Sequence, residues 1–423
     1  MKNGAMGKMR KLGGLLGSLG PGVVAGAADD DPSGIATYSI AGAQFGTSLL
    51  WTALLTWPLM AAVQAMCARI GMVTGRGLVG ALRTKFPRPV LATAAAALFA
   101  ANAINIGADL SGMADAGELL TGVSSHVWVV LFGIAIAWAT IRLRYAVVAS
   151  VLKWLALVLF AYVITAFVTG PDWHSALRDT VVPSLPRTHA GWATLVAILG
   201  TTISPYLFFW QASQEVEEEK ALGRKTLVAR RGATPGEIVR RDIDIGVGTF
   251  FSNFVMFFIM LTTATTLHRH GITHLSSSRQ VAEALRPLAG RFAELLYTLG
   301  LVGTGALAIP TLAGSAAYAF AETFGWREGI DEHFRGAPAF YSVLAIAVAA
   351  GVALDFASIN PLRALYWSAV INGLLAPFLL LGILVAATDR RLMLGQPSPP
   401  LGRAVVAVTT MAMFAAAVAM VVL

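Results

Sequence analysis

Asp29-Asp30-Asp31-Pro32-Ser33-Gly34 interrupts an apolar segment that runs from about residue 20 to residue 45. A charged side chain at the centre of a membrane span costs on the order of 2.5 to 3.5 kcal/mol, so such residues usually face a cavity and mark an ion path. Pro32 removes a backbone donor and Gly34 permits unusual dihedral angles, so the helix can open and free carbonyl oxygens as ligands. The motif therefore predicts a broken transmembrane helix with a polar site at the break.

A second interruption, Gly200-Thr201-Thr202-Ile203-Ser204-Pro205-Tyr206, lies in the apolar segment 190–213 and combines hydroxyl groups with a proline. Paired interruptions at matching places in two halves of a chain are typical of transporters built from inverted repeats, with the substrate at the breaks. A proline that only kinks an ordinary helix is the alternative. A kink needs no adjacent carboxylates, so we interpret the two breaks as parts of one site.

Apolar segments long enough to cross a bilayer recur along the whole chain and predict eleven spans. The first and the sixth span each begin a five-helix half, at about 20–170 and 190–387, and a further helix follows at 403–423. We therefore expect one all-α transmembrane domain over residues 1–423, with a LeuT-like 5+5 inverted repeat and broken helices 1 and 6. The expected spans are 20–45, 48–68, 89–114, 125–141, 145–169, 190–213, 243–266, 292–324, 338–356, 361–387 and 403–423.

Composition agrees with a membrane protein, because 56% of the residues are hydrophobic and 13% are charged. The net charge of +8 could indicate nucleic-acid binding, but Lys and Arg lie between the spans and mostly in loops on one side. This bias predicts a multi-pass protein of the cytoplasmic (inner) membrane, with the N-terminus inside, the C-terminus outside and no nucleic-acid partner. Residues 1–19 are basic but lead into the first span without a cleavage site, so we expect no removable signal peptide.

Common catalytic signatures are missing from the sequence. Cys67 is the single cysteine, which excludes an intramolecular disulfide and a thiolate metal cluster. The sequence contains no Walker A, Rossmann or HExxH motif, which argues against a primary pump and the common enzyme classes. We therefore expect neither an enzyme nor a bound cofactor.

The two breaks resemble those of the Nramp family of divalent metal transporters, whose first helix carries an Asp-Pro-Gly-Asn break and whose sixth carries a Met-Pro-His break. The eleven-span order fits the family as well. Other stretches similar to the family are Gly20-Pro21-Gly22, Ala41-Gly42-Ala43-Gln44-Phe45-Gly46, Ser48-Leu49-Leu50-Trp51, Arg69-Ile70-Gly71-Met72-Val73-Thr74-Gly75 and Ile106-Gly107-Ala108-Asp109-Leu110.

The resemblance implies a ligand set at the breaks. Asp31 takes the place of the family's metal-binding aspartate, and the carbonyl of Thr201 that of a backbone ligand. Three positions depart from the family pattern. Gly34 occupies the position of the family's Asn, Ser204 that of its Met and Tyr206 that of its His. Asp30 is a further candidate ligand. Asp29, Asp109 and Gln211 are expected behind the ligands or in a proton relay.

The departures have a chemical direction. A thioether favours softer transition metals, whereas carboxylate, carbonyl, hydroxyl and water suit hard ions. With Ser204 in place of Met we expect a Mn²⁺ or Mg²⁺ site, the latter holding a partly hydrated ion. Asn102 and Gly112 replace two family carboxylates associated with proton movement, so we expect metal symport or uniport with little or no proton coupling. The protein is expected to be a monomer.

Two other functions use the same residues. An organic-solute transporter on the same scaffold would bind a substrate carboxylate at the helix ends, which three aspartates disfavour. A membrane-embedded aspartyl hydrolase would need two facing carboxylates. Elsewhere, the acidic run 217–219 beside the basic stretch 220–241 predicts a solvated loop, and His268, His270 and His274 predict an ordinary polar loop.

Overall fold

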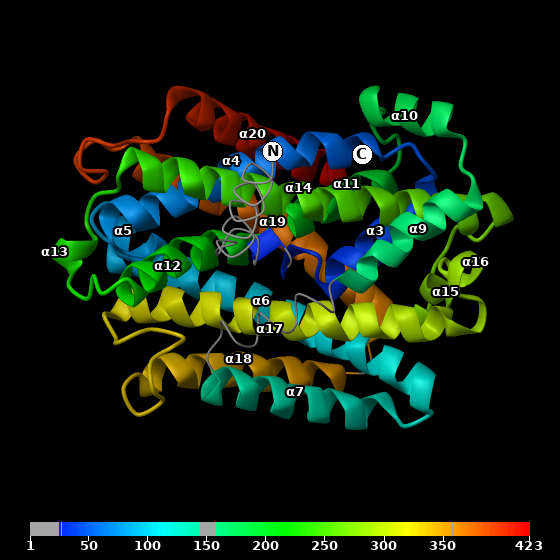
Figure 1. Cartoon of the computed structure of the whole chain (residues 1–423), viewed down its shortest axis with the longest axis horizontal. Coiled ribbons are helices and arrows are strands. Elements are labelled where there is room, and N and C mark those ends of the chain that lie inside the picture. Colours follow the sequence, from blue (N-terminus) through cyan, green and yellow to red (C-terminus); the bar gives the residue numbers. More distant parts are fainter. Residues whose placement is uncertain (1–24, 27, 144–156, 358) are drawn as a thin grey trace, which may run out of the picture.

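The computed structural model describes residues 25–26, 28–143, 157–357 and 359–423. In these ranges the regular structure consists of helices, and no strand is present. Most of the long helices run along the longest axis of the molecule (Figure 1). The expected all-α fold is confirmed.

The long helices share the length and apolar character of membrane spans or of half-spans. They are α3 (Pro32–Phe45), α4 (Trp51–Thr74), α6 (Arg88–Thr121), α7 (Ser125–Arg142), α9 (Phe160–Thr169), α11 (His189–Thr202), α12 (Pro205–Ala221), α14 (Pro235–Thr266), α17 (Ala293–Phe324), α18 (Pro338–Asp355), α19 (Pro361–Thr388) and α20 (Pro400–Val422). Short helices connect them: α5 (Leu78–Leu82), η1 (Leu157–Leu159), α10 (Trp173–Val181), α13 (Leu227–Arg230), η2 (His268–His270), α15 (Ser278–Glu283), α16 (Arg286–Ala289) and η3 (Gly290–Phe292).

Nine segments of the described part of the chain are long and apolar enough to cross a membrane. They correspond to the second, third, fourth and sixth to eleventh expected spans. The first and fifth expected spans, 20–45 and 145–169, lie partly outside the described residues, as do residues 1–19 and Gly20-Pro21-Gly22. The total of eleven therefore stays a prediction.

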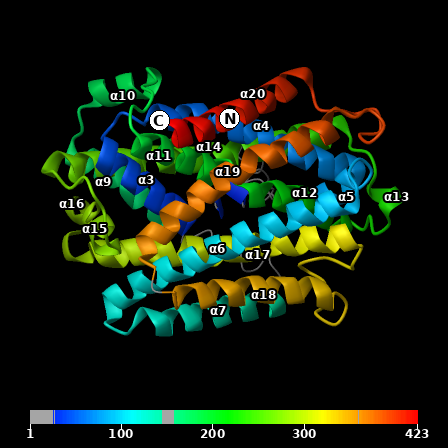
Figure 2. The ribbon, with the colours of Figure 1, turned by 180° about the vertical axis from the view of Figure 1, so that it is seen from behind.

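The helices form two packed groups. α6, α7, α17 and α18 contact one another and make up one side of the molecule (Figures 1 and 2). On the other side α14 packs on α3 and α4, and α19 packs on α11 and α20. The half-helices α3 and α12 contact helices of both groups, and α11 packs beside α3, so the two breaks lie inside the bundle.

The acidic run 217–219 is not a loop, so that expectation is wrong. Helix α12 continues to Ala221, and Glu219 is buried and forms an ion pair with Arg224 at 2.7 Å. A second connection joins α12 to α14, where Arg241 contacts Glu215 at 2.8 Å. Neighbouring charges of opposite sign allow the polar end of α12 to fold against the next helix instead of into solvent.

Close approach of helices depends on glycines at the crossings. A Cβ atom on Gly373 of α19 would lie 2.3 Å from the carbonyl oxygen of Val196 on α11. A Cβ atom on Gly42 of α3 would lie 2.2 Å from the carbonyl oxygen of Met260 on α14. Small residues let helix backbones touch in a bilayer, where dispersion contacts replace the hydrophobic effect between helices. These contacts hold α3 and α11 against the flanking helices.

Gly373→Ala is expected to lower the thermal unfolding midpoint of the purified protein, because the added methyl group must push two backbones apart. The cost should be about 1–3 kcal/mol. Gly246→Ala on α14 is the matched control: a Cβ atom there meets no heavy atom within 4 Å, and alanine favours a helix. Equal losses in the two variants would contradict this account of the packing.

Candidate metal site

The first break lies where the sequence predicts it. Asp29 is helical, Asp30 is a bend, Asp31 is extended, and α3 begins at Pro32. Asp31 caps the new helix, because its Oδ1 accepts hydrogen bonds from Ser33 Oγ and Gly34 N, both at 2.7 Å. Pro32 fits the first helical position, where a backbone donor would have no partner. The chain thus opens the helix and restarts it on the carboxylate of Asp31.

The second break has the same form. α11 ends at Thr202, Ser204 is extended, and α12 begins at Pro205. Ser204 Oγ donates to the carbonyl oxygens of Thr201 at 2.6 Å and Gly200 at 3.0 Å. Each carbonyl keeps a further lone pair. The oxygens of Thr201 and Ser204 therefore lie together at the break.

The two breaks contact each other. The hydroxyl of Tyr206 donates to the carbonyl oxygen of Ala28 at 3.0 Å, across the gap between α12 and the first broken helix. A Cβ atom on Gly34 would lie 3.1 Å from Thr201 Oγ1, so a side chain there would crowd α11. Tyr206 occupies the position of the family's His. Its hydroxyl group thus joins the two interrupted helices through a hydrogen bond.

Helix α6 contributes the other wall of the site. Asn105 Nδ2 donates to Asp31 Oδ2 at 3.1 Å and to Asp109 Oδ2 at 3.4 Å. Asp31 and Asp109 are buried and near enough for their charges to interact. Asn102 instead joins α6 to α17 through the carbonyl of Leu312 at 2.8 Å. Asn102 therefore connects two helices, whereas Asn105 lies at the site.

Asp29 and Asp30 face a different helix. Ser252 Oγ on α14 donates to Asp29 Oδ2 at 2.7 Å and to Asp30 Oδ1 at 3.3 Å. Asp31 bonds to α6 and the two preceding acids to α14, so adjacent carboxylates point to different sides. Sequence reasoning missed Ser252, because a serine in an apolar helix carries no signal of its own.

The residues that the structure describes contain no cluster of three His, Cys, Asp or Glu side chains that could hold a metal ion together. His268 contacts the carbonyl of Ala43 and His270 that of Thr266, at 2.8 and 2.7 Å. A cation at the breaks would accordingly be held by Asp31 together with carbonyl, hydroxyl and water oxygens.

Several buried oxygens around the breaks have no hydrogen-bond partner among the described residues. They are Asp29 Oδ1, Asn105 Oδ1 and Asp109 Oδ1. Buried polar atoms are normally satisfied by protein, water or an ion. The carboxylate of Asp31 already accepts hydrogen bonds from Ser33, Gly34 and Asn105, so a ligand would share it with these donors. An oxygen-lined site of this kind suits a hard, partly hydrated cation.

Gln211 lies apart from this site. It is six residues beyond Pro205 on α12, about 9 Å along the helix axis. Its Nε2 donates to Glu215 Oε1 at 2.7 Å, and Glu215 contacts Arg241. The structure therefore groups Asp31, Gly34, Thr201, Ser204, Tyr206 and Asp109 at the breaks and places Gln211 in the contact between α12 and α14.

Tyr206→Phe is expected to lower stability by about 1–3 kcal/mol, because the buried carbonyl of Ala28 loses its donor. It should also change the KM for metal uptake, since that contact joins the two breaks. Thermal unfolding and transport in proteoliposomes measure the two effects. Tyr341→Phe is the control: its hydroxyl donates to the carbonyl of Ile330 at 2.9 Å in another region. An unchanged KM in Tyr206→Phe would contradict the proposed link.

Comparison with curated proteins finds metal transporters. The divalent metal cation transporter MntH of Yersinia pestis (strain Pestoides F) is 28% identical over 314 residues, which cover 72% of this chain and 73% of that protein. The protein of the same name from Pectobacterium carotovorum subsp. carotovorum (strain PC1) is 28% identical over 310 residues, with 71% of each chain covered.

Solved structures share the fold. The manganese transporter of Eremococcus coleocola, in complex with an aromatic bis-isothiourea substituted compound, has a TM-score of 0.76 at 17% identity and covers 95% of this chain and 85% of its own. MhsT in complex with L-phenylalanine has a TM-score of 0.58 at 16% identity, with coverages of 95% and 98%. These likenesses confirm the LeuT-like fold. Because residues 22–423 match the family model for natural resistance-associated macrophage protein-like sequences, this chain belongs to the Nramp family.

Proposed function

We propose that the protein carries a hard divalent cation, Mn²⁺ or Mg²⁺, across the membrane by alternating access around the two breaks. The observation that supports this most directly is the buried carboxylate of Asp31 at the start of α3, beside the oxygens of the second break. A charge at this depth is expensive unless it serves a cation. Membership of a metal-transporter family and the MntH relatives support the same substrate class.

An organic carboxylate is a poor substrate for this site. MhsT shows that the same fold can hold an amino acid. Such a substrate would need free backbone donors at a helix N-terminus. Here the N–H of Gly34 is already bonded to Asp31, and Asp29, Asp30 and Asp109 add negative charge nearby. The site repels an anion and favours a cation.

The donor set supports the hard end of the divalent metals. Asp31 offers carboxylate oxygen, Thr201 carbonyl oxygen and Ser204 hydroxyl oxygen, while Gly34 offers no side-chain ligand. Water would complete the coordination of Mg²⁺, which keeps several of its own waters. Asp30 and Asp29 add charge behind the site through Ser252.

We also propose the cellular setting. The charge bias of the loops supports a carrier of the cytoplasmic membrane, with the N-terminus inside and the C-terminus outside. We propose in addition that the carrier is a monomer. Asp109 is held by Asn105 and faces Asp31, so it is the candidate proton-relay group. Since Asn102 is engaged with α17 and Gly112 has no titratable group, we propose that transport is weakly coupled or uncoupled to protons.

Asp31→Asn is expected to reduce uptake of both Mn²⁺ and Mg²⁺ at least about tenfold. The substitution removes the carboxylate charge that is hydrogen-bonded both to the start of α3 and to Asn105 on α6. Proteoliposomes with an internal pH dye measure metal and proton entry together. We expect no internal acidification with the wild type.

Asp172→Asn is the matched control, since Asp172 also caps a helix through two backbone donors but lies on the exposed helix α10. Unchanged uptake in Asp31→Asn would exclude the assigned site. Acidification that matches the metal influx would exclude uncoupled transport.

Ser204→Met is expected to raise uptake of Cd²⁺ relative to Mg²⁺ by roughly tenfold, equivalent to ~1.4 kcal/mol, because a thioether prefers soft metals. Competition between the two ions in proteoliposomes measures the ratio. Ser204→Leu has similar volume without sulfur and should not show the change. Equal ratios in Met and Leu variants would mean that position 204 does not contact the metal.

A further inference from the structure

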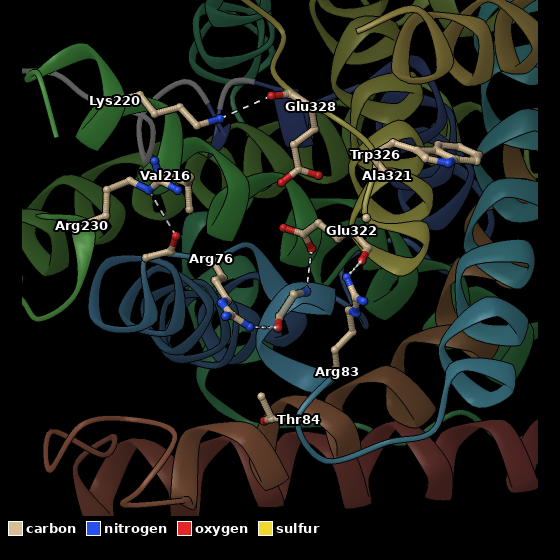
Figure 3. A pocket seen from close by; sticks show the side chains of 13 residues that line it. Arg76, Arg83, Thr84, Val216, Lys220, Arg230, Ala321, Glu322, Trp326 and Glu328 are labelled. Carbon is tan, nitrogen blue, oxygen red and sulfur yellow. Dashed lines mark hydrogen bonds between the residues drawn. The ribbon is translucent and has the colours of Figure 1, made fainter. Parts of the chain in front are cut away.

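A cavity of about 500 Å³ opens at the end of the bundle that holds α5 and α13, away from the two breaks (Figure 3). Its walls come from three parts of the fold: the connection between α4 and α6, helices α12 and α13, and the end of α17 with the residues after it. By the charge bias of the loops this end faces the cytoplasm.

Basic side chains dominate the cavity. Arg76, Arg83, Arg230 and Lys220 all line it, together with Glu322 and Glu328 (Figure 3). Among the described residues, the guanidinium groups donate to backbone carbonyls: Arg76 to Gly80 at 3.4 Å, Arg83 to Glu322 at 3.0 Å, and Arg230 to Gly75 at 3.3 Å and to Lys225 at 2.8 Å.

The three guanidinium charges are not paired. In the described part of the chain none of these arginines forms an ion pair with a carboxylate. Lys220 differs, because its Nζ contacts Glu217 at 2.8 Å. Three unpaired positive charges around one cavity attract an anion and repel the cation that the breaks would carry.

The two glutamates offset only part of this charge. Glu322 is turned to α5, where its Oε2 accepts from Gly80 N at 3.0 Å. Glu328 lies in the loop after α17, and its Oε2 is buried without a hydrogen-bond partner among the described residues. Burial, reinforced by the nearby charge of Glu322, raises the pKa of Glu328 and favours its neutral form. A neutral carboxyl group is itself a donor for an anion.

We propose that this cavity binds a phosphate group, either of a free cytoplasmic phosphate or of an anionic lipid headgroup. Arginine forks match phosphate oxygens in two-point contacts, which a lysine cannot supply. The cavity has room for a phosphate and for part of the molecule that carries it. Arg76, in the connection after α4, and Arg230, at the end of α13, supply unpaired guanidinium groups from two neighbouring segments, and Arg83 supplies the third.

The position gives the ligand a consequence for transport. The cavity joins α12, which continues from the second break, to α17 of the opposite helix group and to the connection that follows α4. A bound phosphate would hold these three parts together. Because a ligand favours the state it binds better, phosphate on this side opposes separation of the two helix groups and slows transport.

The test titrates inorganic phosphate into the purified full chain without metal, at constant ionic strength, and follows the thermal unfolding midpoint. Phosphate should raise the midpoint of the wild type, while Arg76→Gln and Arg230→Gln should each weaken its binding at least about tenfold, the equivalent of ~1.4 kcal/mol. Two variants from different segments of the chain guard against one that fails to fold. Arg335→Gln is the control, since Arg335 is an exposed arginine outside the cavity lining.

A second experiment, in lipid nanodiscs, distinguishes a free phosphate from a lipid headgroup as the ligand. Nanodiscs with phosphatidylglycerol, compared with phosphatidylcholine alone, should reproduce the stabilisation in the wild type and not in Arg76→Gln if a headgroup is the ligand. Stabilisation by inorganic phosphate alone assigns a free phosphate. Equal responses of the wild type and both cavity variants, or no response to either probe, overturn the proposal.

A transport measurement tests the consequence. In proteoliposomes, inorganic phosphate on the α5 side should slow metal uptake by the wild type and leave Arg76→Gln unaffected, with free metal held constant. Phosphate that binds without slowing transport overturns the proposed effect on the helix groups.

Discussion

The carboxylate of Asp31 is the constraint around which the centre of the protein is built. A buried charge in a low-dielectric interior requires hydrogen-bond donors on every available side. Ser33 and Gly34 supply donors from the restarted helix, and Asn105 supplies one from α6. A continuous helix would have used the N–H of Gly34 in its own backbone ladder, so the break at Pro32 is also what makes that donor available. The polar site and the interrupted helix are therefore one feature.

The second break completes that site without adding a charge. Thr201 and Ser204 supply oxygens that are already oriented by their mutual hydrogen bond, and Tyr206 ties the break to the carbonyl of Ala28. Acidic side chains are therefore concentrated on the first broken helix and on α6, while α14 contributes the neutral donor Ser252. This asymmetry agrees with a small cation that is held mainly by one carboxylate and by neutral oxygens.

Charge is also separated along the length of the molecule. Acidic groups are buried at the breaks, whereas unpaired arginines surround the cavity beside α5. Ion pairs such as Arg241 with Glu215 and Arg224 with Glu219 fasten the end of α12 to its neighbours. The half-helix that leaves the second break is thus anchored at its far end by contacts that differ in chemistry from those at its start.

The local sequence was enough to locate both breaks. A proline and charged or hydroxyl residues in a membrane-spanning segment raise its free energy in the bilayer, whichever helices pack around it. Hydropathy likewise located the nine segments of the described chain that are long and apolar enough to cross a membrane. Tertiary structure alone decided that Asp29 and Asp30 turn to Ser252 while Asp31 turns to Asn105. It also decided that residues 217–219 fold into α12, against the expected loop. Those choices depend on which helix lies opposite each side chain, and a hydrogen bond between residues over 200 positions apart, such as that of Ser252 with Asp29, leaves no periodic pattern in the sequence.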